Sequence, residues 1–77
     1  MELNIEVTFP KELKEDPIIC NLCKGFDITL NIVEASFSTD IGWAILILHG
    51  ENEDLKKATD YLIGKGVIIN KVEKVTK

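Results

Sequence analysis

The middle of the chain contains the run Trp43-Ala44-Ile45-Leu46-Ile47-Leu48, in which every residue is apolar. A strand places successive side chains on opposite faces of a sheet, so an entirely apolar strand has two faces that avoid water. The pattern predicts a central strand over 43–48. Each face of the sheet receives three of these six side chains, and each face needs cover.

Two further segments have strand character. Residues 3–9 alternate strictly between apolar and polar side chains, which predicts a strand with one buried face. Residues 67–72 are largely apolar and form the last predicted strand. We expect the tail, residues 73–77, to be frayed.

The segment 27–38 reads as a long strand with a change of phase. Its apolar residues stand at even positions up to Ile32 and at odd positions from Val33 onward. Because the side-chain period of a strand is two, this slip predicts a β-bulge or twist near residues 32–34. A strand with two apolar faces is the alternative.

Two segments between these strands have the period of amphipathic helices. The first begins at Asp16-Pro17, because Asp can cap free amides and Pro suits the first helical position, and Gly25 is its expected end. The second has Asn52 as its expected cap and ends at Gly64 or Gly66. The predicted buried stripes are Ile19, Leu22, Cys23 and Phe26 in the first helix and Leu55, Ala58 and Leu62 in the second.

The predicted order is strand, helix, strand, strand, helix, strand. This is the ferredoxin-like βαββαβ plan of the α+β class, in which two helices cover one face of a four-stranded antiparallel sheet. A chain of 77 residues has room for one such core, so residues 1–77 are expected to form a single domain. The other face is bare, yet it carries half of the apolar strand. We expect a partner to cover it, most simply a second copy in a homodimer; a loop or the C-terminal tail is the alternative.

Composition and charge argue against two classes of function. The net charge is −4 and all nine basic residues are Lys, whereas proteins that read nucleic acids usually need Arg and a basic face. The longest apolar run is far below the roughly 18 residues of a membrane span, and the N-terminal residues lack the pattern of a signal peptide. We expect no nucleic-acid binding, no membrane insertion and a cytoplasmic location.

Cys20 and Cys23 have the spacing of redox and soft-metal sites. Both fall inside the predicted first helix, Cys23 near the buried stripe and Cys20 at its boundary. A zinc site would need two more ligands, and His49 is the only histidine. We therefore interpret Cys23 as core packing and Cys20 as a boundary residue, both as free thiols in a reducing compartment. A soft-metal or redox carrier is the alternative.

No grouping of residues predicts an enzyme. His49 stands alone at the end of an apolar strand, where a structural or surface role is expected. Ser-His-Asp spacing and a Gly-rich phosphate loop are both absent. We expect no catalytic residue, no metal ligand and no cofactor.

Asn31 interrupts an apolar strand, where Asn is disfavoured. Its amide offers a donor and an acceptor, which suits the carboxylate and ammonium groups of an amino acid. The alternative is an edge-strand Asn bonded to water or to a turn. The residues alone leave both interpretations open.

Several motifs resemble, in order, those of the NIL domain family. Asn31-Ile32-Val33 is similar to the Asn-Ile-Leu signature for which the family is named, with Val in place of the final Leu. The other motifs are Asp16-Pro17-Ile18-Ile19, Gly42, Leu48-His49-Gly50, Ala58 with Leu62, and Gly66-Val67. The resemblance covers essentially all 77 residues.

This resemblance implies a ferredoxin-like domain related to ACT domains. NIL domains are best known at the C-terminus of the ATPase subunit of bacterial methionine importers, where they dimerise, bind L-methionine at the interface and shut down transport. The family's Asn contributes to that site and matches Asn31, so the resemblance implies ligand binding by Asn31 with Ile32 and Val33 beside it. The ATPase and the iron–sulfur ligands of related proteins are absent from this sequence, so a transporter ATPase or an enzyme of sulfur amino-acid metabolism would be a partner in trans.

The resemblance thus predicts a small-molecule-binding regulatory module that senses L-methionine or a related amino acid at a homodimer interface. The alternative is a protein-interaction subunit that docks through its open sheet face without any ligand.

Overall fold

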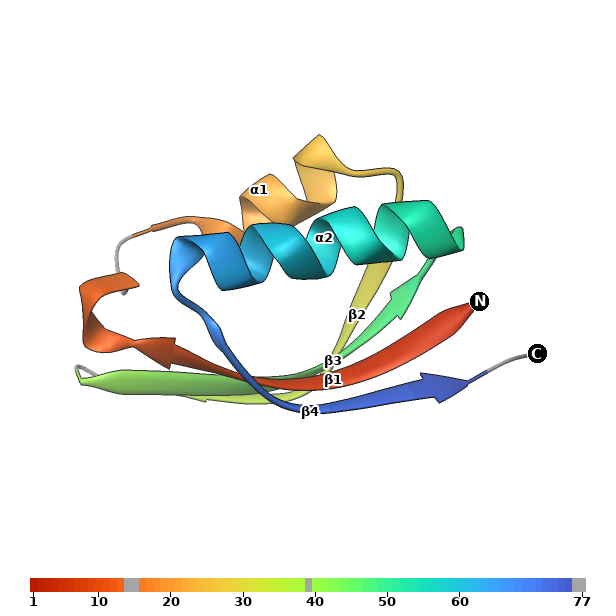
Figure 1. The fold of residues 1–77 in the computed structure, drawn as a ribbon. Coiled ribbons are helices and arrows are strands. Elements are labelled where there is room, and N and C mark those ends of the chain that lie inside the picture. Colours follow the sequence, from red (N-terminus) through yellow and green to blue (C-terminus); the bar gives the residue numbers. More distant parts are fainter. Residues whose placement is uncertain (14–15, 39, 76–77) are drawn as a thin grey trace.

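The computed structural model describes residues 1–13, 16–38 and 40–75. The elements are β1 (Glu2–Pro10), the short 3₁₀ helix η1 (Lys11–Leu13), α1 (Ile18–Gly25), β2 (Thr29–Phe37), β3 (Ile41–His49), α2 (Asn52–Lys65) and β4 (Ile68–Val75). All strand pairs are antiparallel, and both helices lie on the same face of the sheet (Figure 1). The predicted ferredoxin-like plan is confirmed.

The strand order is β2-β3-β1-β4, so β3 and β1 are central and β2 and β4 are the edges. β1 and β3 pair along their whole length, from Glu2 opposite His49 to Pro10 opposite Ile41. The central position predicted for the apolar strand is therefore correct.

The core lies between the sheet and the two helices. The even residues of β3, Ala44, Leu46 and Leu48, have no exposed surface. The odd residues from Trp43 to Ile47 therefore lie on the opposite side, where they are half-buried. We call that side the open face: the odd residues 43–47 of β3 and the residues that pair with them. The rest of the core consists of Leu3, Ile5, Val7, Phe9, Ile18, Leu22, Leu55, Ala58, Leu62 and Val67.

Helix α1 packs on the sheet through most of the predicted stripe, with Leu22 buried and Ile19 and Phe26 packed against the core, but Cys23 is not part of it. Its buried residues are Ile18 and Leu22, which are four positions apart, while Ile19 is only partly buried. This orientation turns Cys23 to the solvent, so its predicted role in core packing is wrong. Cys20 is exposed as well.

The helix starts also differ from expectation. Asp16 does not cap α1; Pro17 occupies the N-cap position, and the Asp16 carboxylate oxygen Oδ2 lies 3.3 Å from Lys65 Nζ. Asn52 is the first residue of α2, and Glu51 is at the N-cap without a side-chain cap. Both predicted caps are therefore wrong, while α1 ends at Gly25 as expected.

The last strand is longer than predicted. Residues 73–75, expected to be frayed, continue β4, and Glu2 pairs with Val75. The reason is that β1 already begins at Glu2, so its first three residues can pair with residues 73–75. Residues 76 and 77 lie outside the described residues. Because the tail through Val75 is an edge strand, it does not fold over the open face.

Gly66 ends α2 with φ of 97°, and its N–H donates to Ile63 O at 3.0 Å. An alanine in this left-handed conformation is strained, so Gly66→Ala should lower the free energy of unfolding by about 1 kcal/mol. Gly64 is helical, and a methyl group added there would meet no heavy atom within 4 Å, so Gly64→Ala should raise it by roughly 0.5 kcal/mol. Urea unfolding of the two variants measures both, and shifts of the same sign would contradict this assignment of the helix end.

Candidate functional site

On the open face, side chains line up in rows across the sheet, because residues that pair on neighbouring strands share a face. Two adjacent rows cross all four strands. In the order β2, β3, β1, β4, the first row is Asn31, Ile47, Asn4 and Glu73. The second row is Glu34, Ile45, Glu6 and Lys71. Polar and charged side chains thus stand on both sides of two central isoleucines.

The β2 strand contains the predicted bulge. Its pairing with β3 shifts between Ile32 and Glu34, leaving Val33 as the extra residue. Val33 lines a hollow together with Ile45 and Ile47, which places it on the open face. The bulge therefore brings two consecutive residues of β2, Val33 and Glu34, to the same side as Asn31.

This hollow has a volume of about 300 Å³. Val33, Ile45 and Ile47 form its apolar wall. The remaining lining residues are Asn4, Ile5, Glu6, Lys71 and Glu73. The site therefore combines an apolar surface with one cationic and two anionic side chains, which is the combination needed to hold a zwitterion with an apolar side chain.

Asn4 contributes an unusual feature to this hollow. Its side-chain Oδ1 is buried and accepts no hydrogen bond from the described residues. Leaving a buried acceptor unpaired costs about 1–3 kcal/mol. Such groups are rare in native structures and call for an explanation. A ligand that donates a hydrogen bond here would supply one.

The three residues expected to bind ligand do not share one face. Asn31 is exposed on the open face and takes part in none of the side-chain hydrogen bonds among the described residues. Val33 is on the same face and 57% exposed. Ile32 pairs with Leu46 and so lies on the helix side of the sheet, from which its side chain cannot reach the hollow.

Four polar lining residues were not predicted as site residues. The strict alternation of residues 3–9 already placed Asn4 and Glu6 opposite the core, which was a usable signal. No such signal marked Lys71 and Glu73. The face of the sheet on which they lie is set by a bulge in β4, at the point where its pairing with β1 shifts between Glu6 and Val7.

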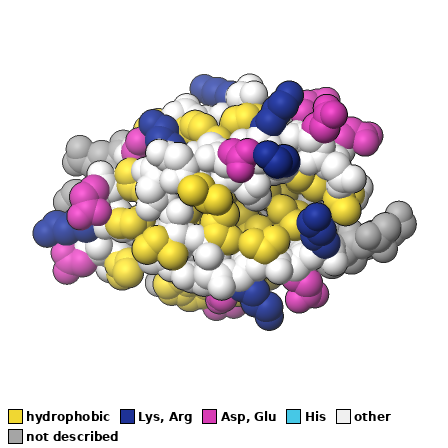
Figure 2. Space-filling model, viewed as in Figure 1, with side chains coloured by type: hydrophobic (Ala, Val, Ile, Leu, Met, Phe, Trp, Pro, Cys, Tyr) yellow, Lys and Arg dark blue, Asp and Glu magenta, His cyan; other side chains and the backbone are white. Residues whose placement is uncertain are grey.

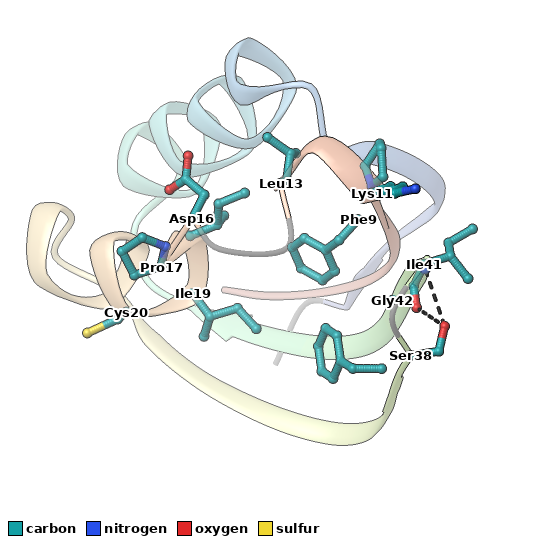
Figure 3. A pocket seen from close by; sticks show the side chains of 13 residues that line it. Phe9, Lys11, Leu13, Asp16, Pro17, Ile19, Cys20, Ser38, Ile41 and Gly42 are labelled. Atoms are coloured by element: carbon teal, nitrogen blue, oxygen red, sulfur yellow. Dashed lines mark hydrogen bonds between the residues drawn. The ribbon is translucent and has the colours of Figure 1, made fainter.

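A second hollow lies beside the start of α1, between it and the β2–β3 turn (Figure 3). It is largely apolar, with the Phe9 and Phe37 ring centroids 5.8 Å apart. Its hydroxyl and charged groups are already engaged: the Ser38 hydroxyl donates to Ile41 O and accepts from Ile41 N, Asp16 is paired with Lys65, and Lys11 with Asp40. This hollow therefore has fewer groups available to pair with the charges of an amino acid than the open-face hollow has.

A third hollow, of about 640 Å³, lies between α2 and β4, where apolar side chains gather below the charged surface of the helix (Figure 2). Its charged lining residues are Lys56 and Lys74. It has no carboxylate to receive an ammonium group, so it does not match an amino acid either.

His49 has a structural contact, as expected. Its Nε2 lies 2.8 Å from Glu2 Oε1, between residues that pair at the end of β1 and β3. Across the described residues, no three His, Cys, Asp or Glu side chains come together as a metal site. None of the helices in the described part of the chain has the length and apolar character to cross a bilayer.

Comparisons with known proteins agree on the family. The model of the NIL domain matches residues 3–71. Two curated proteins named methionine import ATP-binding protein MetN, from Chlamydia felis and Chlamydia caviae, are 35% and 31% identical over 74 residues. Both alignments cover 91% of this chain, which spans only 22% of the length of either relative.

Two solved structures share the fold. The C-terminal domain of an ABC transporter ATP-binding protein from Enterococcus faecalis has a TM-score of 0.72 at 19% identity, over 91% of this chain and 79% of that one. A de novo designed protein, Foldit4, has a TM-score of 0.61 at 12% identity, over 99% and 96%. At these identities the likeness concerns the fold alone.

The unpaired acceptor predicts an unusual stability effect. Asn4→Leu removes the buried polar group and should raise the free energy of unfolding by about 1 kcal/mol. Thr8→Val is the matched control on the same strand and face: its hydroxyl accepts from Asn70 Nδ2 at 2.7 Å, so this variant should lose stability. Urea denaturation measures the free energy of unfolding of both variants. A loss of stability in Asn4→Leu would mean that Asn4 Oδ1 already accepts a hydrogen bond in the free protein.

Proposed function

Because the chain belongs to the NIL domain family, we propose that it is a regulatory domain that binds methionine or a related amino acid on its open face, at the interface of a homodimer. The relatives named methionine import ATP-binding proteins support this ligand, and they support a transporter ATPase as the regulated partner. An enzyme of sulfur amino-acid metabolism is the alternative partner. Regulation of an ATPase also implies a cytoplasmic location, where ATP is hydrolysed.

The observation that carries the proposal is the mixed lining of the open-face hollow. Lys71 can pair with the α-carboxylate of an amino acid, and Glu6 or Glu73 with its ammonium group. The ammonium group can also donate to the unpaired Asn4 Oδ1. These contacts use both charges of the zwitterion.

The apolar wall fits the rest of the ligand. Val33, Ile45 and Ile47 offer surface to an unbranched thioether side chain, which adapts to irregular apolar surroundings. Asn31 stands next to Ile47 in the same row, at the β2 end of the site. There its amide can bond to the carboxylate or ammonium group, while Ile32 would contribute only through its backbone.

The same face supports a homodimer. Trp43, Ile45 and Ile47 are half-buried in one chain, and Val33 and Ile68 beside them are 57% and 52% exposed. A second copy docked face to face would remove these side chains from water and enclose the ligand. Ligand binding can regulate a partner only if the ligand binds one state of the dimer more tightly than another.

Titration calorimetry tests the ligand site. L-Methionine should bind saturably at one site per chain, and Asn31→Ala should weaken this binding by at least about tenfold, the usual effect of losing a hydrogen bond to a charged group. The urea midpoint should hardly change, because Asn31 is exposed and makes no contact that folding needs. Asn21→Ala, at an exposed Asn of α1, is the matched control and should bind normally.

Homocysteine, cysteine and leucine serve as comparison ligands. If folded protein shows no heat of binding with methionine or with any of these three amino acids, the proposal of ligand sensing is overturned. That result would favour the alternative of a module that docks on another protein through its open face.

Static light scattering tests the interface. The wild-type chain should have twice the monomer mass, and Ile47→Glu should return it to a monomer because the carboxylate would be buried at the interface. Ile63→Glu places the same charge on α2 at a side chain that is 60% exposed, and it should remain dimeric. A monomeric wild type at high concentration, or dissociation by Ile63→Glu alone, would contradict the open-face dimer.

A further inference from the structure

Neither the core nor the open-face site uses the two cysteines of α1. Both are free and exposed to solvent, while Ile18 and Leu22 make the buried contacts of the helix. Packing therefore does not account for them. The Cys20 side chain stands at the rim of the hollow beside α1, with its sulfur directed away from Phe9 (Figure 3).

The spacing of the cysteines brings the two thiols close together. Residues three apart on an α-helix are surface neighbours, with Cβ atoms about 5–6 Å apart. Both side chains are exposed on a helix of eight residues, so both sulfurs can turn toward a common point in solvent. One ion can thus bridge them without a change in the core.

The surroundings limit the coordination number. Among residues 1–13, 16–38 and 40–75, no third His, Cys, Asp or Glu joins the pair in a metal-binding group. Asp16, one turn before Cys20, is paired with Lys65. A structural zinc ion needs four ligands, whereas Cu(I) prefers soft thiolates and accepts two of them.

We propose that Cys20 and Cys23 bind one Cu(I) ion as a two-coordinate dithiolate site on the exposed side of α1. Binding exchanges two thiol protons for one Cu(I) ion, so two protons are released and no electron is transferred. The product, with two thiolates on a monovalent ion, carries one negative charge.

The position of the pair suits that charge. Cys20 lies in the first turn of α1, which contains no acidic residue and whose N-terminus has no side-chain cap hydrogen bond. Asp16, which precedes the helix, is paired with Lys65. The free amides and the dipole at a helix N-terminus stabilise a nearby negative charge. Lys24, which directly follows Cys23, adds a cation in the last turn of the helix.

An anaerobic competition titration tests the site. Reduced protein is titrated with Cu(I) held by a chromophoric chelator, and the loss of chelator colour reports transfer to the protein. The wild type should take up one Cu(I) per chain. Cys20→Ser and Cys23→Ser should each lower the affinity for Cu(I) by at least about 100-fold. Removing a residue that only supports a metal ligand already lowers affinity by up to about 100-fold, and removing the ligand itself should lower it at least as much. Asn21→Ser, which lies between them, should bind like the wild type.

Three outcomes would overturn the site. The first is retention of Cu(I) by the Cys20→Ser, Cys23→Ser double variant, and the second is binding of Zn(II) by the wild type as strongly as Cu(I). The third outcome is one ion per two chains, with a dimer that forms only when metal is added. Because the thiols are exposed, circular dichroism should show both single variants folded. Asn31→Ala should retain full Cu(I) binding, so failure of the amino-acid site and failure of the copper site are distinguishable.

Discussion

Strand β3 is apolar on both sides and occupies the middle of the sheet, and this placement determines how both faces of the domain are built. Its even residues are covered by α1 and α2 and carry the centre of the core. Its odd residues face away from the helices, and the described chain supplies nothing to cover them. The two helices cover one face of the sheet, and residues 1–13, 16–38 and 40–75 contain no further element for the second. The hydrophobic effect that forms the core therefore also favours association through the open face.

The open face is specialised as well as apolar. The flanking strands place Glu6, Lys71 and Glu73 around the isoleucines of β3, and Asn4 holds a buried oxygen without a donor among the described residues. Retaining an unpaired acceptor in a small domain lowers stability, which is only a few kcal/mol in total at this size. A ligand that donated a hydrogen bond to this oxygen would offset the loss.

Sequence patterns predicted the architecture well because long alternating segments leave little freedom. Residues 3–9 show one period over seven positions, and the phase slip near Ile32 predicted the position of the bulge. Helix α1 was harder: eight residues make barely two turns, and one apolar residue at the helix start, Ile18, is enough to rotate the buried side away from Cys23. The family signature pointed to Asn31.

Most of the charged part of the candidate site could not be predicted in the same way. Two of its three charged residues, Lys71 and Glu73, come from β4, whose pairing partner is distant in sequence and whose own bulge decides which side chains reach the open face. Local periodicity carries no information on either point. The alternation of residues 3–9 predicts the correct face for Asn4 and Glu6, but their meeting with Lys71 and Glu73 depends on the strand order.

The two proposed sites lie on opposite sides of the sheet. The amino-acid site is proposed for the open face, whereas the two exposed cysteines belong to α1, which lies on the other face of the sheet (Figure 1). Since the thiols make no core contact, a metal ion between them leaves the packing of Ile18 and Leu22 unchanged. A ligand can shift a second site only through a difference in its affinity for two states of the protein. Coupling between the two proposed sites would therefore require two states of the protein that the metal ion and the amino acid each bind with different affinity.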